Sequence, residues 1–80
     1  MQNGAIRMGI SYNKLWKIMI DRKINKSELR NLTGMGTTTL AKLGKNQPVS
    51  MDVLLRIGAV LHCDISDICE FTIDGGPGNE

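Results

Sequence analysis

The strongest constraint on the fold is a set of residues that can begin helices, spaced closely along the middle of the chain. At these positions a side-chain oxygen can accept from the free N–H groups of a first helical turn, or a glycine leaves those groups open to water. They are Ser11, Asn25, Gly36, Ser50 and Asp64. Each precedes a segment in which apolar residues recur three or four positions apart, the period of an amphipathic helix. The sequence therefore predicts five short helices.

The apolar positions of these segments predict one small core. The first helix is expected from Tyr12 to near Lys23, the second stops at Gly34, and the third starts at Thr37. Glycine suits the stop because a Cβ is costly in the left-handed conformation. Since 80 residues support one domain at most, we expect an all-α bundle of five helices. The residues predicted on the apolar faces are Tyr12, Leu15, Trp16, Met19, Ile20, Leu29, Leu32, Leu40, Leu43, Val53, Leu54, Ile57, Val60, Leu61, Ile65 and Ile68.

Two short segments outside the helices alternate between apolar and polar residues, which is typical of strands. The first covers residues 5–12, and the second contains Phe71 and Ile73. They are expected to pair as a small two-stranded element, within one chain or between two. The chain then divides into an arm or strand over 1–11, a helical domain over 12–71 and a flexible acidic tail over 72–80. Met8 is an alternative natural start, which would make residues 1–7 an extension.

The net charge of +2 conceals two halves of opposite sign. Residues 1–50 carry nine Lys and Arg against two acids, Asp21 and Glu28, a balance of +7. Residues 51–80 carry Arg56 against six acids, a balance of −5. This division predicts a basic side that faces a polyanion and a separate acidic side. Chance clustering of charge along the chain is the alternative.

The cysteines and the single histidine indicate neither a metal site nor a catalytic one. Cys63 and Cys69 lack C-x-x-C spacing, and His62 has no second Cys/His cluster to complete zinc coordination. We therefore expect structural thiols in a reducing compartment, no cofactor and no enzymatic activity. We also expect no small-molecule effector. No signal peptide or apolar run of about 20 residues is visible, so the predicted location is the cytoplasm, with no membrane partner.

The second and third helices, joined through Gly34, carry the clearest functional signal. Short helices joined by a glycine-containing turn are typical of a helix-turn-helix unit. The runs Ile24-Asn25-Lys26-Ser27-Glu28-Leu29 and Gly34-Met35-Gly36-Thr37-Thr38-Thr39-Leu40-Ala41-Lys42-Leu43 resemble the lambda-repressor-like, Cro-type helix-turn-helix family, also called the xenobiotic-response-element family. The resemblance extends over about residues 12–71, which it implies are a DNA-binding domain. The chain departs from the family's pattern at Arg30, Gly36 and Gly44.

The resemblance implies roles for outward-facing residues of the third helix. It assigns contacts with base edges to Thr37, Thr38 and Lys42. Threonine can hydrogen-bond a base or touch the thymine methyl, and lysine can reach guanine O6 and N7. Ordinary surface threonines and lysines are the alternative. The residues expected to contact DNA phosphates are Asn25, Lys26, Thr39, Lys45 and Asn46.

These observations predict a regulator of transcription, with repression as the expected effect, that binds double-stranded DNA as a homodimer. The resemblance implies the dimer, and the candidate dimer elements are the arm at residues 5–11 and the strand near 70–73. The alternative is an antitoxin-like or adaptor module that keeps the fold and binds another protein. The third helix leaves this alternative open because it lacks Arg and Gln.

Overall fold

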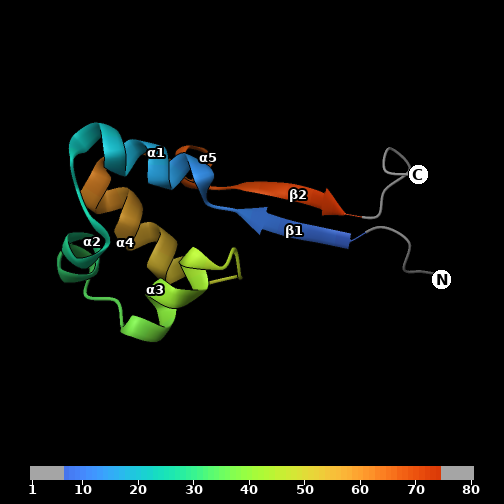
Figure 1. The fold of residues 1–80 in the computed structure, drawn as a ribbon, viewed down its shortest axis with the longest axis horizontal. Coiled ribbons are helices and arrows are strands. Elements are labelled where there is room, and N and C mark those ends of the chain that lie inside the picture. Colours follow the sequence, from blue (N-terminus) through green and yellow to red (C-terminus); the bar gives the residue numbers. More distant parts are fainter. Residues whose placement is uncertain (1–6, 75–80) are drawn as a thin grey trace.

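The computed structural model describes residues 7–74, which form five helices and one two-stranded antiparallel sheet (Figure 1). The predicted five-helix bundle with a small two-stranded element is confirmed. No helix in this part of the chain is long and apolar enough to cross a membrane. The elements are β1 (Arg7–Ser11), α1 (Asn13–Arg22), α2 (Lys26–Thr33), α3 (Thr37–Gly44), α4 (Met51–Leu61), α5 (Ile65–Ile68) and β2 (Glu70–Asp74).

Four of the five predicted helix starts are confirmed. The Asn25 side chain accepts a hydrogen bond from the backbone N–H of Glu28 at 2.8 Å, and the Glu28 carboxylate accepts one in return at 2.9 Å. Asp64 begins α5 with the same reciprocal arrangement, Ser50 caps α4, and Gly36 precedes α3. The prediction for Ser11 is wrong. The cap position of α1 is the next residue, and the Ser11 hydroxyl accepts from the backbone N–H of Asn13 at 3.3 Å.

The core lies where α1, α2, α4 and α5 meet, with one buried leucine from α3. Three of the predicted inward positions are wrong, since Ile20 is 74% exposed, Leu32 is 58% exposed and Ile65 is 41% exposed. On α2, Thr33 takes the inward place one turn after Leu29, and its hydroxyl is satisfied by donating to the Leu29 carbonyl at 2.8 Å. On α5, four residues make barely one turn, so only one large side chain reaches the core. The fully buried side chains are Tyr12, Leu15, Leu29, Leu43, Ile57, Leu61 and Ile68.

The two strands pair within one chain and project from the helices as a ribbon (Figure 1). Met8 lies opposite Ile73, and Ile10 lies opposite Phe71. Because β2 continues to Asp74, it includes the first three residues of the predicted tail. The rest of that tail, 75–80, and the first six residues of the predicted arm lie outside the described residues. One face of the ribbon therefore carries four apolar side chains.

Candidate nucleic-acid interface

The turn between α2 and α3 is fixed by backbone and side-chain contacts. Gly34 ends α2 at φ 75°, and its N–H donates to the Arg30 carbonyl at 2.8 Å. Met35 is buried beneath the turn. From α4, the Arg56 guanidinium donates to the carbonyl of Thr33 at 3.5 Å. The end of α2 is thus bonded to α4, and a buried residue fixes the start of the segment that leads into α3.

Helix α3 has one buried side and one side open to solvent. Leu43 is fully buried and Leu40 is half-buried, so the opposite side of the helix faces outward. Thr37, Thr38 and Lys42 are exposed there, and within residues 7–74 their side chains make no hydrogen bond or ion pair. Thr38 and Lys42 are one helical turn apart on one face. All three residues predicted to contact bases are therefore free to bind a ligand.

At the start of α2, Lys26, a predicted phosphate contact, lies against the ring of Trp16, and the sequence did not predict this contact. The Lys26 ammonium lies 4.8 Å from the centre of the Trp16 ring, a cation–π contact. The same ammonium lies 3.9 Å from the position that a Cβ on Gly44 would occupy. Lys26 therefore bridges α1 and the C-terminal end of α3, whose dipole favours a cation. The Asn25 side-chain oxygen is occupied by the cap of α2, so only its amide N–H groups remain for a phosphate.

The loop between α3 and α4 is held against the start of α1. The Asn46 side-chain oxygen accepts from the backbone N–H of Tyr12 at 3.2 Å. The Tyr12 hydroxyl donates to the Gln47 carbonyl at 2.8 Å. Burial, and secondly the nearby charge of Cys69, raise the pKa of the Tyr12 hydroxyl. This hydroxyl stays protonated at neutral pH, and the loop presents an exposed Lys45 and the free amide N–H groups of Asn46.

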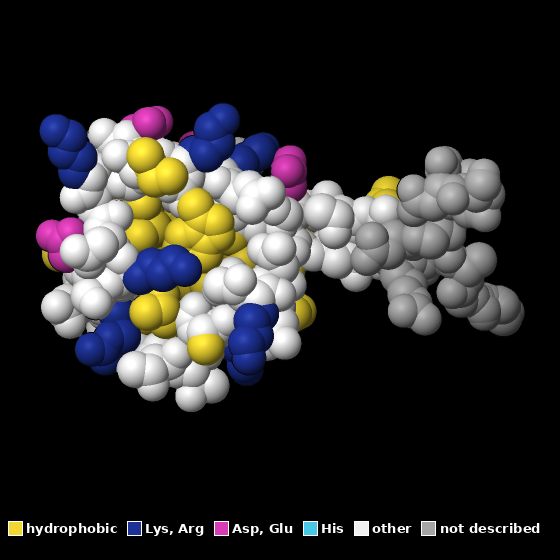
Figure 2. All heavy atoms as spheres, in the orientation of Figure 1, with side chains coloured by type: hydrophobic (Ala, Val, Ile, Leu, Met, Phe, Trp, Pro, Cys, Tyr) yellow, Lys and Arg dark blue, Asp and Glu magenta, His cyan; other side chains and the backbone are white. Residues whose placement is uncertain are grey.

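Lys and Arg side chains gather around an apolar area on the face formed by α1, α2 and α3 (Figure 2). A hollow of about 400 Å³ there is lined by Trp16, Ile20 and Ile24 among others, with Lys26 at its rim. We call the set of exposed residues Lys26, Thr37, Thr38, Lys42 and Lys45 the α3 face. Within residues 7–74 none of its lysines forms an ion pair. Thr39, the other predicted phosphate contact, is half-buried at its edge.

Two cations of the basic half and Arg56 of the acidic half do not contribute to this face, which the sequence did not reveal. Lys14 pairs with Glu70 at 3.6 Å, Arg22 donates to the Leu61 carbonyl, and Arg56 pairs with Asp52 at 2.9 Å. Only the Asp52–Arg56 pair has a signal in the sequence, a spacing of four on one helix. The other two contacts join residues 56 and 39 positions apart, so no local pattern could predict them.

The cysteines lie apart from the α3 face. Burial, followed by the charge of Asp67, raises the pKa of the Cys63 thiol, and burial raises that of Cys69. Both are free thiols. Within residues 7–74 no three His, Cys, Asp or Glu side chains come together as a metal site would need. His62 ends α4 in a left-handed conformation, with φ 55°.

Comparison with known proteins agrees with this geometry. Residues 14–74 match the family model of the Cro/C1-type helix-turn-helix DNA-binding domain. Among solved structures, the chain is similar to one titled "Crystal structure of transcriptional regulator VanUg, Form II". The two chains are 49% identical and superpose with a TM-score of 0.81, over 90% of this chain and 97% of that one. No curated protein matches the chain.

Proposed function

The chain belongs to the Cro/C1-type helix-turn-helix family of DNA-binding domains, and from this premise we propose that it is a repressor that binds duplex DNA sequence-specifically. One observation carries the proposal. Thr37, Thr38 and Lys42 stand exposed and unpaired, among the described residues, on the helix that follows the turn. The similarity to VanUg, titled a transcriptional regulator, supports the regulatory role.

In this proposal α3 enters the major groove and reads base edges. The hydroxyl and methyl groups of Thr37 and Thr38 meet adenine–thymine pairs, and Lys42 reaches guanine O6 and N7. A helix that lies in the groove needs its free side turned outward, and the burial of Leu43 on the opposite side supports that orientation.

The proposed phosphate contacts lie together at the C-terminal end of α3. Lys26, supported by Trp16, lies 3.9 Å from the position that a Cβ on Gly44 would occupy, and Lys45 and Asn46 follow Gly44 in the chain. Such contacts fix the register of a protein on the duplex without reading sequence. Asn25 and Thr39 contribute less in this proposal, because the oxygen of Asn25 is occupied and Thr39 is half-buried.

Two copies are proposed to bind together on a near-palindromic site. A single small module buries too little surface for strong specific binding. Two α3 helices on one side of the duplex require half-sites about one helical turn, roughly 34 Å, apart. A repressor must share a compartment with the DNA that it binds. Cys63 and Cys69 are free thiols, which are typical of a reducing compartment and support the cytoplasm as the location.

The proposal is tested with a duplex selected by the protein from a random pool. Thr38→Ala should change the preference among duplexes by about 1–3 kcal/mol at the bases it contacts. Lys26→Ala should weaken binding to all duplexes alike. Lys14→Ala is the matched control, because Lys14 is already paired with Glu70, and it should leave affinity and preference unchanged.

Two results would contradict the proposal. If the wild-type protein binds no duplex at low salt, the antitoxin-like or adaptor function becomes the better interpretation. If Thr38→Ala and Lys26→Ala merely scale the affinity for all duplexes equally, the protein still binds DNA, but the base contacts are misassigned.

A further inference from the structure

Exposed apolar side chains are concentrated on one side of the molecule. Eight large hydrophobic residues are exposed in the described part of the chain, and only Ile20 and Leu32 lie on α1 or α2. The other six belong to α4, α5 and the ribbon, and we call them the apolar strip. They are Met8, Met51, Leu55, Ile65, Phe71 and Ile73. Their exposed fractions range from 41% for Ile65 to 76% for Phe71.

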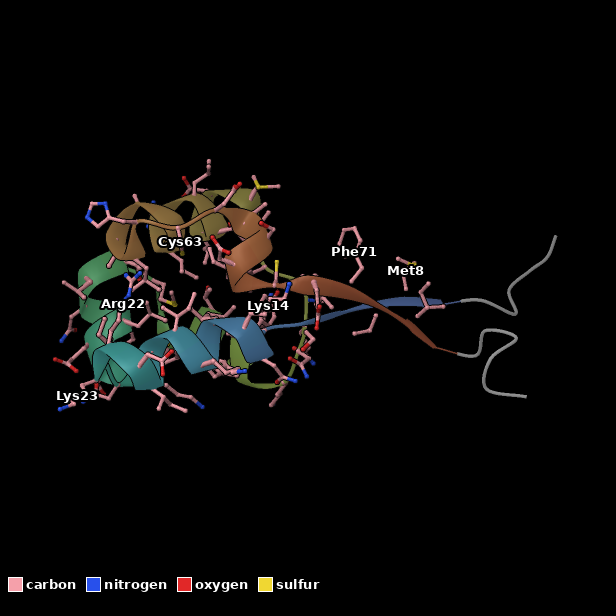
Figure 3. All side chains as sticks on the ribbon, turned by 90° about the horizontal axis from the view of Figure 1, so that it is seen from above. Met8, Lys14, Arg22, Lys23, Cys63 and Phe71 are labelled. Atoms are coloured by element: carbon pink, nitrogen blue, oxygen red, sulfur yellow. The ribbon has the colours of Figure 1, made fainter. Side chains whose placement is uncertain are left out.

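The strip is continuous because three hollows along it share lining residues. Met51, Leu55 and Ile65 line a hollow of about 540 Å³ between α4 and α5. Ile65 also lines a second hollow, of about 220 Å³, together with Phe71. Phe71 lines a third, of about 400 Å³, with Met8 at the base of the ribbon. Figure 3 shows Met8 and Phe71 projecting from the ribbon toward the side on which α4 lies.

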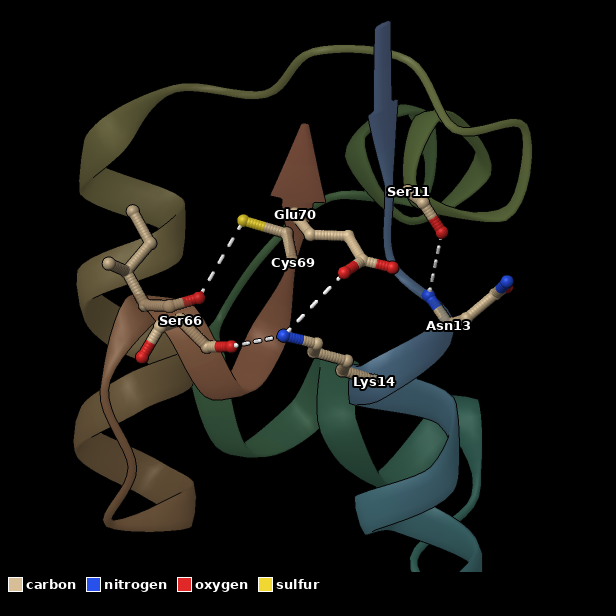
Figure 4. A network of polar contacts seen from close by, with 7 residues as sticks. Ser11, Asn13, Lys14, Ser66, Cys69 and Glu70 are labelled. Atoms are coloured by element: carbon tan, nitrogen blue, oxygen red, sulfur yellow. Dashed lines mark hydrogen bonds and ion pairs between the residues drawn. The ribbon is translucent and has the colours of Figure 1, made fainter. Parts of the chain in front are cut away.

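Of the four acids that border the strip, two are paired with cations and two are hydrogen-bonded to the backbone. Glu70 pairs with Lys14, which also donates to the Ser66 carbonyl at 3.2 Å (Figure 4). Asp52 pairs with Arg56. The side chains of Asp64 and Asp67 accept hydrogen bonds from backbone N–H groups at the start of α5. The strip therefore presents mainly apolar surface, and among the described residues only Asp64 and Asp67 at its border carry charge without a cationic partner, so most of its area can pack on an identical surface.

We propose that the apolar strip is the surface through which two copies of this chain associate. The inference deepens the proposed function, because it supplies the contact for the proposed dimer on DNA. Monomers rarely leave so long an apolar surface open. A two-stranded ribbon is also marginal in water unless its apolar face is covered. The strip contains no residue of α2 or α3, so two copies joined along it leave Lys26, Thr37, Thr38 and Lys42 uncovered. Its hollow at Met8 and Phe71 is also lined by Asn46, so the second copy must leave the amide of Asn46 open to the duplex.

A second copy fits better than an unrelated protein on grounds of symmetry and size. In a two-fold dimer the same patch is used by both partners, so the patch must be complementary to itself. A strip of six apolar side chains meets that condition, because apolar surface packs on apolar surface. A standard interface buries about 800 Å² per partner, which six large apolar side chains and their surroundings can supply from a total surface of 5350 Å².

The test compares Phe71→Ser with Ile20→Ser in the full chain. Phe71 and Ile20 are exposed by 76% and 74%, but Ile20 lies outside the strip. Sedimentation equilibrium should show wild-type and Ile20→Ser proteins as dimers of the 8.8 kDa chain. Phe71→Ser should raise the dimer dissociation constant by about tenfold or more. Leu55→Ser, on α4, is a second variant that should do the same, and circular dichroism confirms that each variant is folded.

The outcomes separate this inference from the proposed function. A wild-type chain that stays monomeric up to about 100 µM overturns the inference, since common dimers form well below that concentration. Equal dissociation of the Ile20→Ser and Phe71→Ser variants overturns the assignment to the strip. A mixed-sequence duplex at low salt, long enough for one copy only, reports DNA binding independently. If wild-type and Phe71→Ser proteins bind it alike, DNA binding stands whatever the outcome for the dimer.

Discussion

The α3 face and the apolar strip use lysine and arginine in opposite ways. On the α3 face, Lys26, Lys42 and Lys45 have no acidic partner among residues 7–74. On the side of the strip, Lys14 and Arg56 are paired with acids of the same chain. A net charge counted along the sequence cannot separate these two uses. The comparison teaches that the available positive charge, and not the total, identifies the surface that meets a polyanion.

The salt concentration should have the largest effect, because it should weaken DNA binding through the α3 face but not self-association through the apolar strip. If each of two subunits places Lys26 and Lys45 on phosphates, raising salt from 50 to 200 mM should lower duplex affinity by about a hundredfold. Self-association through the strip should change little or strengthen over the same range, because it buries mainly apolar surface and salt screens the repulsion between the acids of the two copies. Fluorescence titration of duplex and sedimentation at both salts measure the two effects. Parallel weakening of both processes would show that charge also governs the strip.

Two further substitutions should separate DNA binding from stability, with smaller effects than salt has. Lys45→Ala should reduce the salt slope of duplex binding by about one per subunit and leave the free energy of unfolding unchanged. Arg22→Ala should lower the free energy of unfolding by about 1 kcal/mol, because the Leu61 carbonyl loses its donor. Its duplex affinity should stay within about twofold of wild type. Urea unfolding and duplex titration give both values for each variant.

The same pair also shows what would contradict the comparison. A strong loss of duplex affinity in Arg22→Ala would mean that this guanidinium reaches DNA and is not held by α4. A loss of stability in Lys45→Ala would mean that the loop after α3 depends on its lysine and not on the contacts of Tyr12.

Local signals in the sequence were sufficient for most of the helical framework. The capping box of Asn25 and Glu28 and the left-handed stop at Gly34 are properties of a few adjacent residues, and each is found where it was expected. The strands were also predictable, because a period of two is a local pattern. The sequence left open whether they pair within one chain or between two. In the structure β1 pairs with β2 of the same chain.

The wrong predictions have a common physical cause. The buried side of a helix and the contacts between distant residues depend on how the helices pack, and a local pattern contains no information on that packing. Leu32 and Thr33 both have the spacing to follow Leu29 inward, but the packing of α2 on α4 buries Thr33, whose hydroxyl is then satisfied by the Leu29 carbonyl. The contact of Lys26 with Trp16 depends on how α1 crosses the start of α2. The roles of Thr37, Thr38 and Lys42 remain predictions, although all three are now known to be exposed.

Alkaline pH should have the smallest effect, which is a lower free energy of unfolding without a change in duplex affinity. The pKa values of Tyr12, Cys63 and Cys69 are all raised, mainly by burial, so folding favours their neutral forms. This stabilisation is fully present below the pKa values of the unfolded chain, about 8.5 for Cys and 10 for Tyr. It is lost as pH rises through the higher values of the folded state.

The free energy of unfolding should therefore be steady from about pH 6 to 8 and decline toward pH 10, as urea unfolding can measure. Replacing Cys63 and Cys69 together by Ala should reduce the decline below about pH 9.5, where Tyr12 is still neutral. Duplex affinity should stay constant to about pH 9, because Tyr12, Cys63 and Cys69 do not belong to the α3 face. A stability that rises between pH 8 and 10 would contradict the burial of these groups. A duplex affinity that falls in step with stability would mean that the α3 face depends on the region around Cys63 and Cys69, so that the two surfaces are not independent.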